Sequence, residues 1–155
     1  MKMKEKIYFI TLTFFGVGKI PIGQGTVASL ISGILYFSFI SGNKFLEIFI
    51  NIFILVVSFL LIKKVKIFWK DNDPHEVVID EVAGIFLSLL LLPKGFLVFV
   101  AALLIFRFLD ITKIPPIIFF DRMKSPYGIL LDDIVSGIIA NFIVRLLLKF
   151  NILPI

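Results

Sequence analysis

The stretch "HEVVIDEVAGIFLSLLLLP", residues 75–93, places two adjacent acids, Asp80 and Glu81, directly before an apolar run. The run predicts a helix that begins near the two acids and ends before Pro93. Acids in the first turn of a helix are ordinarily explained by the helix dipole, which favours negative charge there. A carboxylate beside membrane hydrocarbon is costly, however, and it needs a partner, a metal ion or a function. The stretch therefore predicts a short helix that begins either at a simple cap or at a functional site.

The composition of the chain is that of an integral membrane protein. Hydrophobic residues make up 59% of its 155 positions, against about 45–50% in soluble domains. The chain has no cysteine, which excludes a disulfide framework and thiolate catalysis. Its net charge of +5 suits an anionic membrane surface, and no nucleic-acid-binding motif is found. We therefore expect one domain, residues 1–155, whose partner is the membrane and not a nucleic acid.

Five apolar segments follow one another along the chain, at residues 26–40, 45–62, 82–92, 96–109 and 134–150. Most are shorter than the roughly 20 residues that a helix needs to cross a bilayer. The segment 82–92 is the shortest, and the turn-forming "PKG" separates it from the next one. The pattern predicts an all-α fold, a compact multi-helix integral membrane bundle of short apolar helices, some of which need not cross.

Basic residues predict the orientation of this bundle. Three lysines lie within the first six residues, and "KKVKIFWK" occupies residues 63–70, so both segments are expected in the cytoplasm. The same threading places the loops 63–81 and 107–133 inside. Nine of the eleven acids then lie in these two loops: Asp71, Asp73, Glu76, Asp80, Glu81, Asp110, Asp121, Asp132 and Asp133. This convergence predicts an active site on the cytoplasmic face of a multi-pass protein.

The acids fall at the predicted ends of helices. Asp132 and Asp133 are expected to open the last helix, as Asp80 and Glu81 open theirs, and Asp110 follows the fourth apolar segment. Clustered carboxylates repel one another unless a cation lies between them, and Mg²⁺ prefers oxygen ligands. We therefore expect a Mg²⁺ site whose candidate ligands are Asp80, Glu81, Asp110, Asp132 and Asp133.

Two cations accompany these acids. Arg107 and Asp110 are three residues apart and share a helix face, so a local ion pair would explain Arg107 taken alone. Beside a carboxylate–metal site, Arg107 and Lys113 instead favour a phosphate clamp, because guanidinium binds phosphate through two parallel bonds and ammonium acts as a point charge. His75 is the single histidine, which excludes a mechanism needing two, and we expect it in a surface loop.

A glycine-rich segment, "GVGKIPIGQGTVASL" at residues 16–30, precedes the first apolar helix. Backbone N–H groups at such a helix start bind phosphate, although the spacing is neither that of a P-loop nor that of a dinucleotide-binding motif. Small residues four apart in this segment also favour close helix packing, and both explanations can hold. The candidate substrate-binding residues are Lys19, Gly25, Thr26, Ser29, Arg107 and Lys113.

Three blocks of the sequence together resemble the phosphatidylglycerophosphatase A family. They are "GKIPIGQGTVASL" (residues 18–30), "HEVVIDEVAG" (75–84) and "FRFLDITKIPPIIFFDRMKSPYGILLDDIVSGIIAN" (106–141). Order and spacing agree from about residue 16 to residue 140, and the last block is long and specific. The charged positions of the family's pattern match Asp80, Glu81, Arg107, Asp110, Lys113, Asp121, Asp132 and Asp133.

The resemblance implies a Mg²⁺-dependent lipid phosphatase of the bacterial inner membrane. Such an enzyme would convert phosphatidylglycerophosphate in the bilayer to phosphatidylglycerol, the last step in the synthesis of that lipid. The residues expected to take part in catalysis are Glu81, Arg107, Asp110, Lys113 and Asp133. Attack on phosphorus by water and by an aspartate carboxylate are both compatible with this set.

Two other functions use the same acids. A cation-binding membrane protein without enzymatic activity, such as a small ion carrier, would not need Arg107 and Lys113. Another lipid-phosphate hydrolase would need them equally. A CDP-alcohol phosphotransferase also clusters aspartates around Mg²⁺, but its characteristic spacing is absent from this chain.

Overall fold

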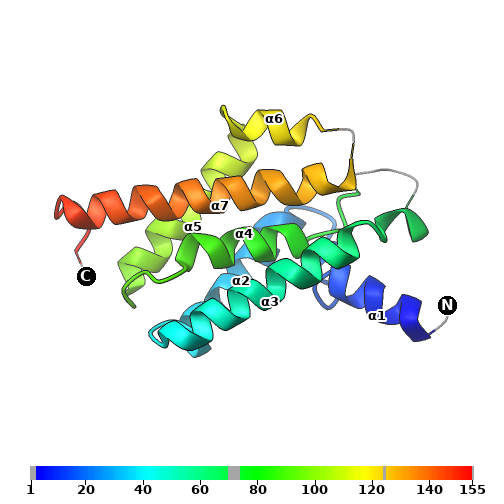
Figure 1. The fold of residues 1–155 in the computed structure, drawn as a ribbon, viewed down its shortest axis with the longest axis horizontal. Coiled ribbons are helices and arrows are strands. Elements are labelled where there is room, and N and C mark those ends of the chain that lie inside the picture. Colours follow the sequence, from blue (N-terminus) through cyan, green and yellow to red (C-terminus); the bar gives the residue numbers. More distant parts are fainter. Residues whose placement is uncertain (1–2, 70–73, 124, 155) are drawn as a thin grey trace.

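The computed structural model describes residues 3–69, 74–123 and 125–154. Within these residues the fold is all-helical, with no strand, which confirms the predicted fold class (Figure 1). The helices are α1 (Met3–Leu12), η1 (Val17–Lys19), α2 (Gln24–Phe39), α3 (Lys44–Ile62), η2 (Val65–Ile67), α4 (Ile79–Leu89), α5 (Phe96–Thr112), α6 (Ile117–Asp121) and α7 (Pro126–Lys149).

The short helix α4 is the centre of the bundle. Its 11 residues give a length of about 16 Å, and α2, α3, α5 and α7 all pack against it. The closest approach is to α7, where a Cβ atom added at Gly137 would clash with the backbone carbonyl of Gly84. Glycine at these positions lets the two helices run side by side, and both begin at the same end of the bundle (Figure 1).

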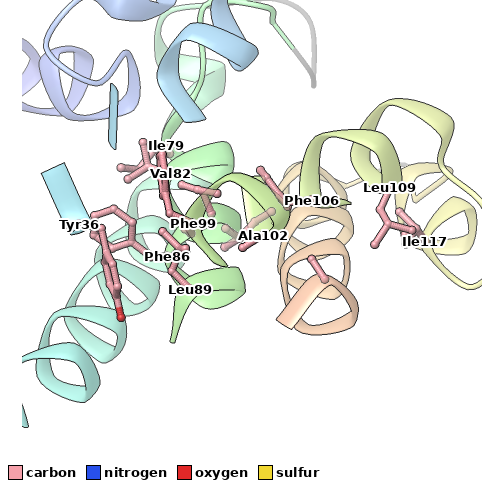
Figure 2. Close-up of a cluster of buried hydrophobic side chains, with 14 of the residues drawn as sticks. Tyr36, Ile79, Val82, Phe86, Leu89, Phe99, Ala102, Phe106, Leu109 and Ile117 are labelled. Atoms are coloured by element: carbon pink, nitrogen blue, oxygen red, sulfur yellow. The ribbon is translucent and has the colours of Figure 1, made fainter. Parts of the chain in front are cut away.

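A cluster of buried apolar side chains fixes α4 against its neighbours (Figure 2). The ring of Tyr36 on α2 lies 5.0 Å from that of Phe86 on α4, and Phe106 on α5 would contact any side chain placed at Gly84. The labelled members of the cluster are Tyr36, Ile79, Val82, Phe86, Leu89, Phe99, Ala102, Phe106, Leu109 and Ile117. These contacts fix the positions of helices α2, α4 and α5 relative to one another.

Polar side chains fix the far end of α4, where the chain turns at Leu90 and Leu91. The carboxylate of Glu47 on α3 is 1% exposed and accepts hydrogen bonds from the backbone N–H of Leu91 (2.6 Å) and of Gly42 (2.8 Å). The amide of Asn141 and the guanidinium of Arg145 donate to the carbonyl of Leu90, both at 2.9 Å. These bonds satisfy backbone groups that a helix end leaves free, so α4 is held at both ends.

The outer surface of the bundle is strongly apolar. Helix α3 exposes Phe49, Ile52 and Phe53 among other large hydrophobic side chains. Among the described residues, α3 is the one helix long and apolar enough to cross a membrane, and α2 is apolar but shorter. A membrane span at α3 agrees with the predicted class, whereas crossing by the other helices stays a prediction.

One predicted helix boundary is wrong. Asp132 and Asp133 do not open the last helix, because α7 begins at Pro126. Ser125 caps it by accepting a hydrogen bond from the N–H of Tyr127 (3.3 Å), and proline is favoured in the first turn. The two aspartates therefore lie inside α7. The predicted helix start at Asp80 and Glu81 is confirmed, since α4 begins at Ile79.

Candidate active site

A cavity of about 320 Å³ opens where α2 and α4 begin and where α5 ends. It collects charged side chains from segments far apart in the sequence. The charged residues that line it are Asp80, Glu81, Arg107, Asp110, Lys113, Asp121, Asp132 and Asp133. The structure therefore brings these six acids together with Arg107 and Lys113 around one cavity, as the sequence predicted for them.

Asp80, Glu81 and Asp133 form the first group of acids in this cavity. One oxygen of each lies within 4.8 Å of the others, and Asp80 and Asp133 are 5% and 2% exposed. In the described structure the atoms Asp80 Oδ1, Glu81 Oε2 and Asp133 Oδ1 are buried without a hydrogen-bond partner. Buried polar atoms in this state are costly, and oxygen ligands of this kind suit a hard divalent cation. We name this group the open triad.

Burial also disfavours the charged form of the carboxyl groups in the open triad. The carboxyl groups of Asp80 and Asp133 lie outside the apolar segments 82–92 and 134–150. Burial first, and then the neighbouring carboxylates, raise the pKa of both groups well above the ordinary value. A bound divalent cation would reverse this effect, because it stabilises the ionised form.

Asp110, Asp132 and Asp133 form a second group with similar spacing, but a cation of the chain itself already lies against it. The ammonium of Lys113 donates to Asp110 Oδ1 at 2.8 Å and to Asp132 Oδ2. The guanidinium of Arg107 lies 2.6 Å from the other oxygen of Asp110. Asp110 and Asp132 are thus neutralised by Lys113 and Arg107, and we name this arrangement the lysine-filled group.

Lys113 owes its position to the end of α5. It is the residue after the helix and has a left-handed backbone, with φ of 47°, so that its side chain returns to the cavity. Burial acts to lower the pKa of its ammonium, but the surrounding carboxylates, Asp133 first, outweigh burial and raise that pKa. The raised pKa favours the ammonium form of Lys113, which donates hydrogen bonds to Asp110 and Asp132.

Arg107 is held against the start of α2. Its guanidinium donates to Thr26 Oγ1 (3.1 Å) and Ser29 Oγ (3.4 Å). Gly25 leaves room for this arrangement, because a Cβ atom at that position would clash with the carboxylate of Glu81, which lies beside the guanidinium of Arg107. Helix α2 begins without a side-chain cap, so its first N–H groups are available to an anion at the cavity.

The predicted substrate-binding residues reach the cavity to different degrees. Gly25 and Thr26 line it, whereas Ser29 is buried behind them and acts through its contact with Arg107. Lys19 is not brought to the cavity lining; its ammonium lies 4.7 Å from the ring centre of Phe9. The reason is tertiary, since Gly18 packs against the backbone of Glu76 and fixes the direction of the loop.

Several lining residues were not among the predicted site residues: Gln24, His75, Asp121 and Ser125. Asp121 lies 3.9 Å from the ammonium of Lys113, and it was part of the matching charged pattern. His75 is exposed, as expected, but it lies at the cavity. Gln24 carried no separate signal, because an amide at a helix start is unremarkable in a sequence.

Comparison with known proteins shows which family the chain resembles. The sequence model of the phosphatidylglycerophosphatase A family matches residues 10–148. A Haemophilus influenzae protein named phosphatidylglycerophosphatase A is 33% identical over 135 residues, which is 84% of this chain and 82% of the relative. The Escherichia coli protein of that name is 42% identical over 71 residues, 44% of this chain and 41% of the relative.

A third relative, from Bacteroides thetaiotaomicron, is provisionally named a phosphatidylinositol-3-phosphatase and is 27% identical over 152 residues, 93% of this chain and 95% of the relative. No solved structure matches the chain. The family match extends over both groups of acids, Arg107 and Lys113. The chain therefore belongs to the phosphatidylglycerophosphatase A family, and it is a phosphatase, a hydrolase of phosphoric monoesters.

Proposed function

We propose that the protein hydrolyses phosphatidylglycerophosphate to phosphatidylglycerol and phosphate in a Mg²⁺-dependent reaction. The observation that carries the proposal is the open triad, in which each carboxylate has one buried oxygen without a hydrogen-bond partner, beside two fixed cations, Arg107 and Lys113. A carboxylate–metal centre next to a guanidinium and an ammonium is suited to a phosphate monoester. The acyl chains of the lipid would remain in the bilayer of a bacterial inner membrane, and the cavity would face the cytoplasm.

The open triad, Asp80, Glu81 and Asp133, would hold the Mg²⁺. When bound, this ion would neutralise phosphate charge and promote formation of the nucleophile. The sequence prediction included Asp110 and Asp132 among the ligands. We now assign these two to holding Lys113, because its ammonium already satisfies them. We therefore propose that the cavity holds one Mg²⁺ at the open triad, while the ammonium of Lys113 neutralises the second group of acids.

Arg107, Lys113 and the start of α2 would bind the oxygens of the phosphoryl group. Arg107 is oriented by Asp110, Thr26 and Ser29, so its fork needs little reorganisation when the substrate arrives. Lys113 stays protonated and can stabilise charge that develops on those oxygens. The P–O ester bond breaks, and the leaving alkoxide of phosphatidylglycerol takes up a proton.

The identity of the nucleophile separates two routes. Water attacks directly in one, and in the other a carboxylate of the cluster attacks first and water then hydrolyses the phosphoaspartate. Substrate whose terminal phosphate carries ³²P distinguishes them when turnover is stopped with acid and the protein itself is analysed. Radioactivity bound to the protein and released by hydroxylamine indicates the phosphoaspartate, and labelled phosphate with none on the protein indicates direct attack.

Phosphate release tests the proposed function. Protein purified in detergent is given phosphatidylglycerophosphate with Mg²⁺ or with EDTA, and a phosphatidylinositol phosphate is assayed in parallel. We expect release from phosphatidylglycerophosphate only with Mg²⁺. Release that persists in EDTA would contradict the metal requirement. Cation binding without release from either lipid would instead support the ion-carrier alternative.

A further inference from the structure

The cavity is divided by the chemistry of its lining. Its floor is charged and buried, with Asp80, Asp132 and Asp133 all close to fully covered. Its more exposed lining includes the uncharged side chains of Gln24 and Ser125, both half-buried, which we call the neutral part, and beside them the exposed His75 and Asp121. A ligand that fills the cavity can therefore reach buried ionic groups and also the uncharged hydrogen-bonding groups of the neutral part.

Gln24 is the uncommitted group of this neutral part. The hydroxyl of Thr26 is occupied by Arg107, and that of Ser125 caps α7. Among the described residues, the side chain of Gln24 has no hydrogen-bond partner, and no other carboxamide lines the cavity. Its side chain can donate two hydrogen bonds and accept one or two more.

The position of Gln24 is fixed on the backbone. It is the first residue of α2, after Gly23 with a φ of 69°, and it directly precedes Gly25, which lies against Glu81 and Arg107. A group bound at Arg107 therefore lies near Gly25, the residue that follows Gln24 in the chain. Gln24 and Arg107 line the same cavity, so a ligand whose phosphate is held at Arg107 extends into space that Gln24 also borders.

We propose that Gln24 is a specificity-determining residue that recognises the free hydroxyl of the glycerol in the lipid headgroup. The inference rests on the proposed function, since a terminal phosphate on the cavity floor leaves the glycerol at the neutral part. A hydroxyl both donates and accepts, as a carboxamide does. A site built to bond a hydroxyl discriminates against the analogue that lacks it.

The test compares two lipids of equal charge. One is phosphatidylglycerophosphate, and the other is its deoxy analogue, in which propanediol replaces the headgroup glycerol. The ratio of kcat/KM for the two lipids is measured in the same detergent micelles for wild type, for Gln24→Leu and for a control, Ser38→Ala, at the exposed far end of α2. Leucine has a similar size and no hydrogen-bonding group.

We expect wild type and Ser38→Ala to prefer the hydroxylated lipid by about three- to tenfold, the effect of one neutral hydrogen bond. In Gln24→Leu the ratio should fall close to one. The inference is overturned if the ratio is unchanged in Gln24→Leu, or if wild type does not discriminate between the two lipids. In either case, phosphate release from phosphatidylglycerophosphate by wild type still supports the proposed function. No phosphate release by wild type from either lipid would overturn both.

Discussion

At the scale of single residues, Asp133 is the aspartate shared by the open triad and the lysine-filled group. One of its oxygens is buried without a partner. Asp132, its neighbour in the sequence, is instead bonded to the ammonium of Lys113. Two adjacent aspartates therefore have different environments, and their substitutions should have different effects.

Asp133→Asn and Asp132→Asn separate these roles. Asp133→Asn removes a proposed metal ligand, so the half-saturating Mg²⁺ concentration should rise by about 100-fold or more, or turnover should vanish. Asp132→Asn loosens Lys113, and kcat should fall by about 10- to 100-fold with a smaller change in the Mg²⁺ requirement. The measurement is phosphate release against Mg²⁺ concentration for both variants. Equal shifts in the two, or none, would contradict the assignment.

Arg107→Lys tests the phosphate clamp. If Arg107 only pairs with Asp110, lysine should replace it at modest cost, because lysine keeps the positive charge that the ion pair needs. Lysine cannot reproduce the planar fork, and loss of such a transition-state contact costs about 100- to 1000-fold in kcat. We expect a loss of that size at saturating lipid with expression unchanged. Arg122→Lys, an exposed arginine outside the cavity lining, is the control. A kcat for Arg107→Lys within a few-fold of wild type means that Arg107 is structural.

At the scale of helices, α4 carries Asp80 and Glu81 at one end and is fixed at the other by Glu47 of α3. The carboxylate of Glu47 accepts bonds from the backbone N–H of Gly42 and Leu91 and from the hydroxyl of Tyr36 (3.2 Å). Leu91 has a left-handed backbone, with φ of 55°, which it holds although leucine disfavours it. Glu47 thus stabilises a turn that the local sequence does not favour.

Glu47→Ala should destabilise the bundle without altering the chemistry. It removes the acceptor of the part-buried backbone N–H groups of Gly42 and Leu91 and of the buried Tyr36 hydroxyl, and a buried polar group that loses its partner costs about 1–3 kcal/mol. We expect a lower unfolding temperature in detergent and, in the protein that remains folded, an unchanged Mg²⁺ requirement. Ile48→Ala, at the exposed neighbouring position, is the control and should change the unfolding temperature less. Equal unfolding temperatures for Glu47→Ala and Ile48→Ala would contradict the stabilising role of Glu47.

The helices were largely predictable from the sequence, and the pairing inside the cavity was not. Hydropathy and the flanking Pro93 predicted the short α4, and the acids predicted its start. The start of α7 was misplaced because the acid pair was given more weight than the cap formed by Ser125 and Pro126. Whether an aspartate pairs with Lys113 or keeps an unpaired oxygen depends on the distance between α5 and α7. No local sequence pattern encodes that distance.

At the scale of the whole molecule, the four buried aspartates among the described residues gather at one end of a largely apolar bundle, whereas the buried Glu47 lies at the other end of α4. Both α4 and α7 begin at that end (Figure 1), and the basic segment after α3 follows a helix long enough to span. The arrangement agrees with an enzyme that keeps its lipid in the bilayer and admits the headgroup from one side.

Cysteine labelling tests the proposed orientation. The chain has no cysteine, so Lys66→Cys and Lys94→Cys each introduce a single thiol. In intact cells a membrane-impermeant reagent should label Lys94→Cys and leave Lys66→Cys unlabelled until the cells are opened. Asn72, in the same predicted inner loop as Lys66, lies outside the described residues. Labelling of Lys66→Cys in intact cells would reverse the orientation.

Each chain should hold one divalent cation at Asp80, Glu81 and Asp133, since the ammonium of Lys113 already neutralises Asp110 and Asp132. Mn²⁺ suits the same oxygen ligands as Mg²⁺ and is detected by electron paramagnetic resonance, so its binding to detergent-purified protein measures the number of ions directly. We expect one Mn²⁺ per chain in wild type and in Asp132→Asn, and greatly weakened binding in Asp133→Asn. Two ions per wild-type chain, or undiminished binding in Asp133→Asn, would contradict this assignment of the metal site.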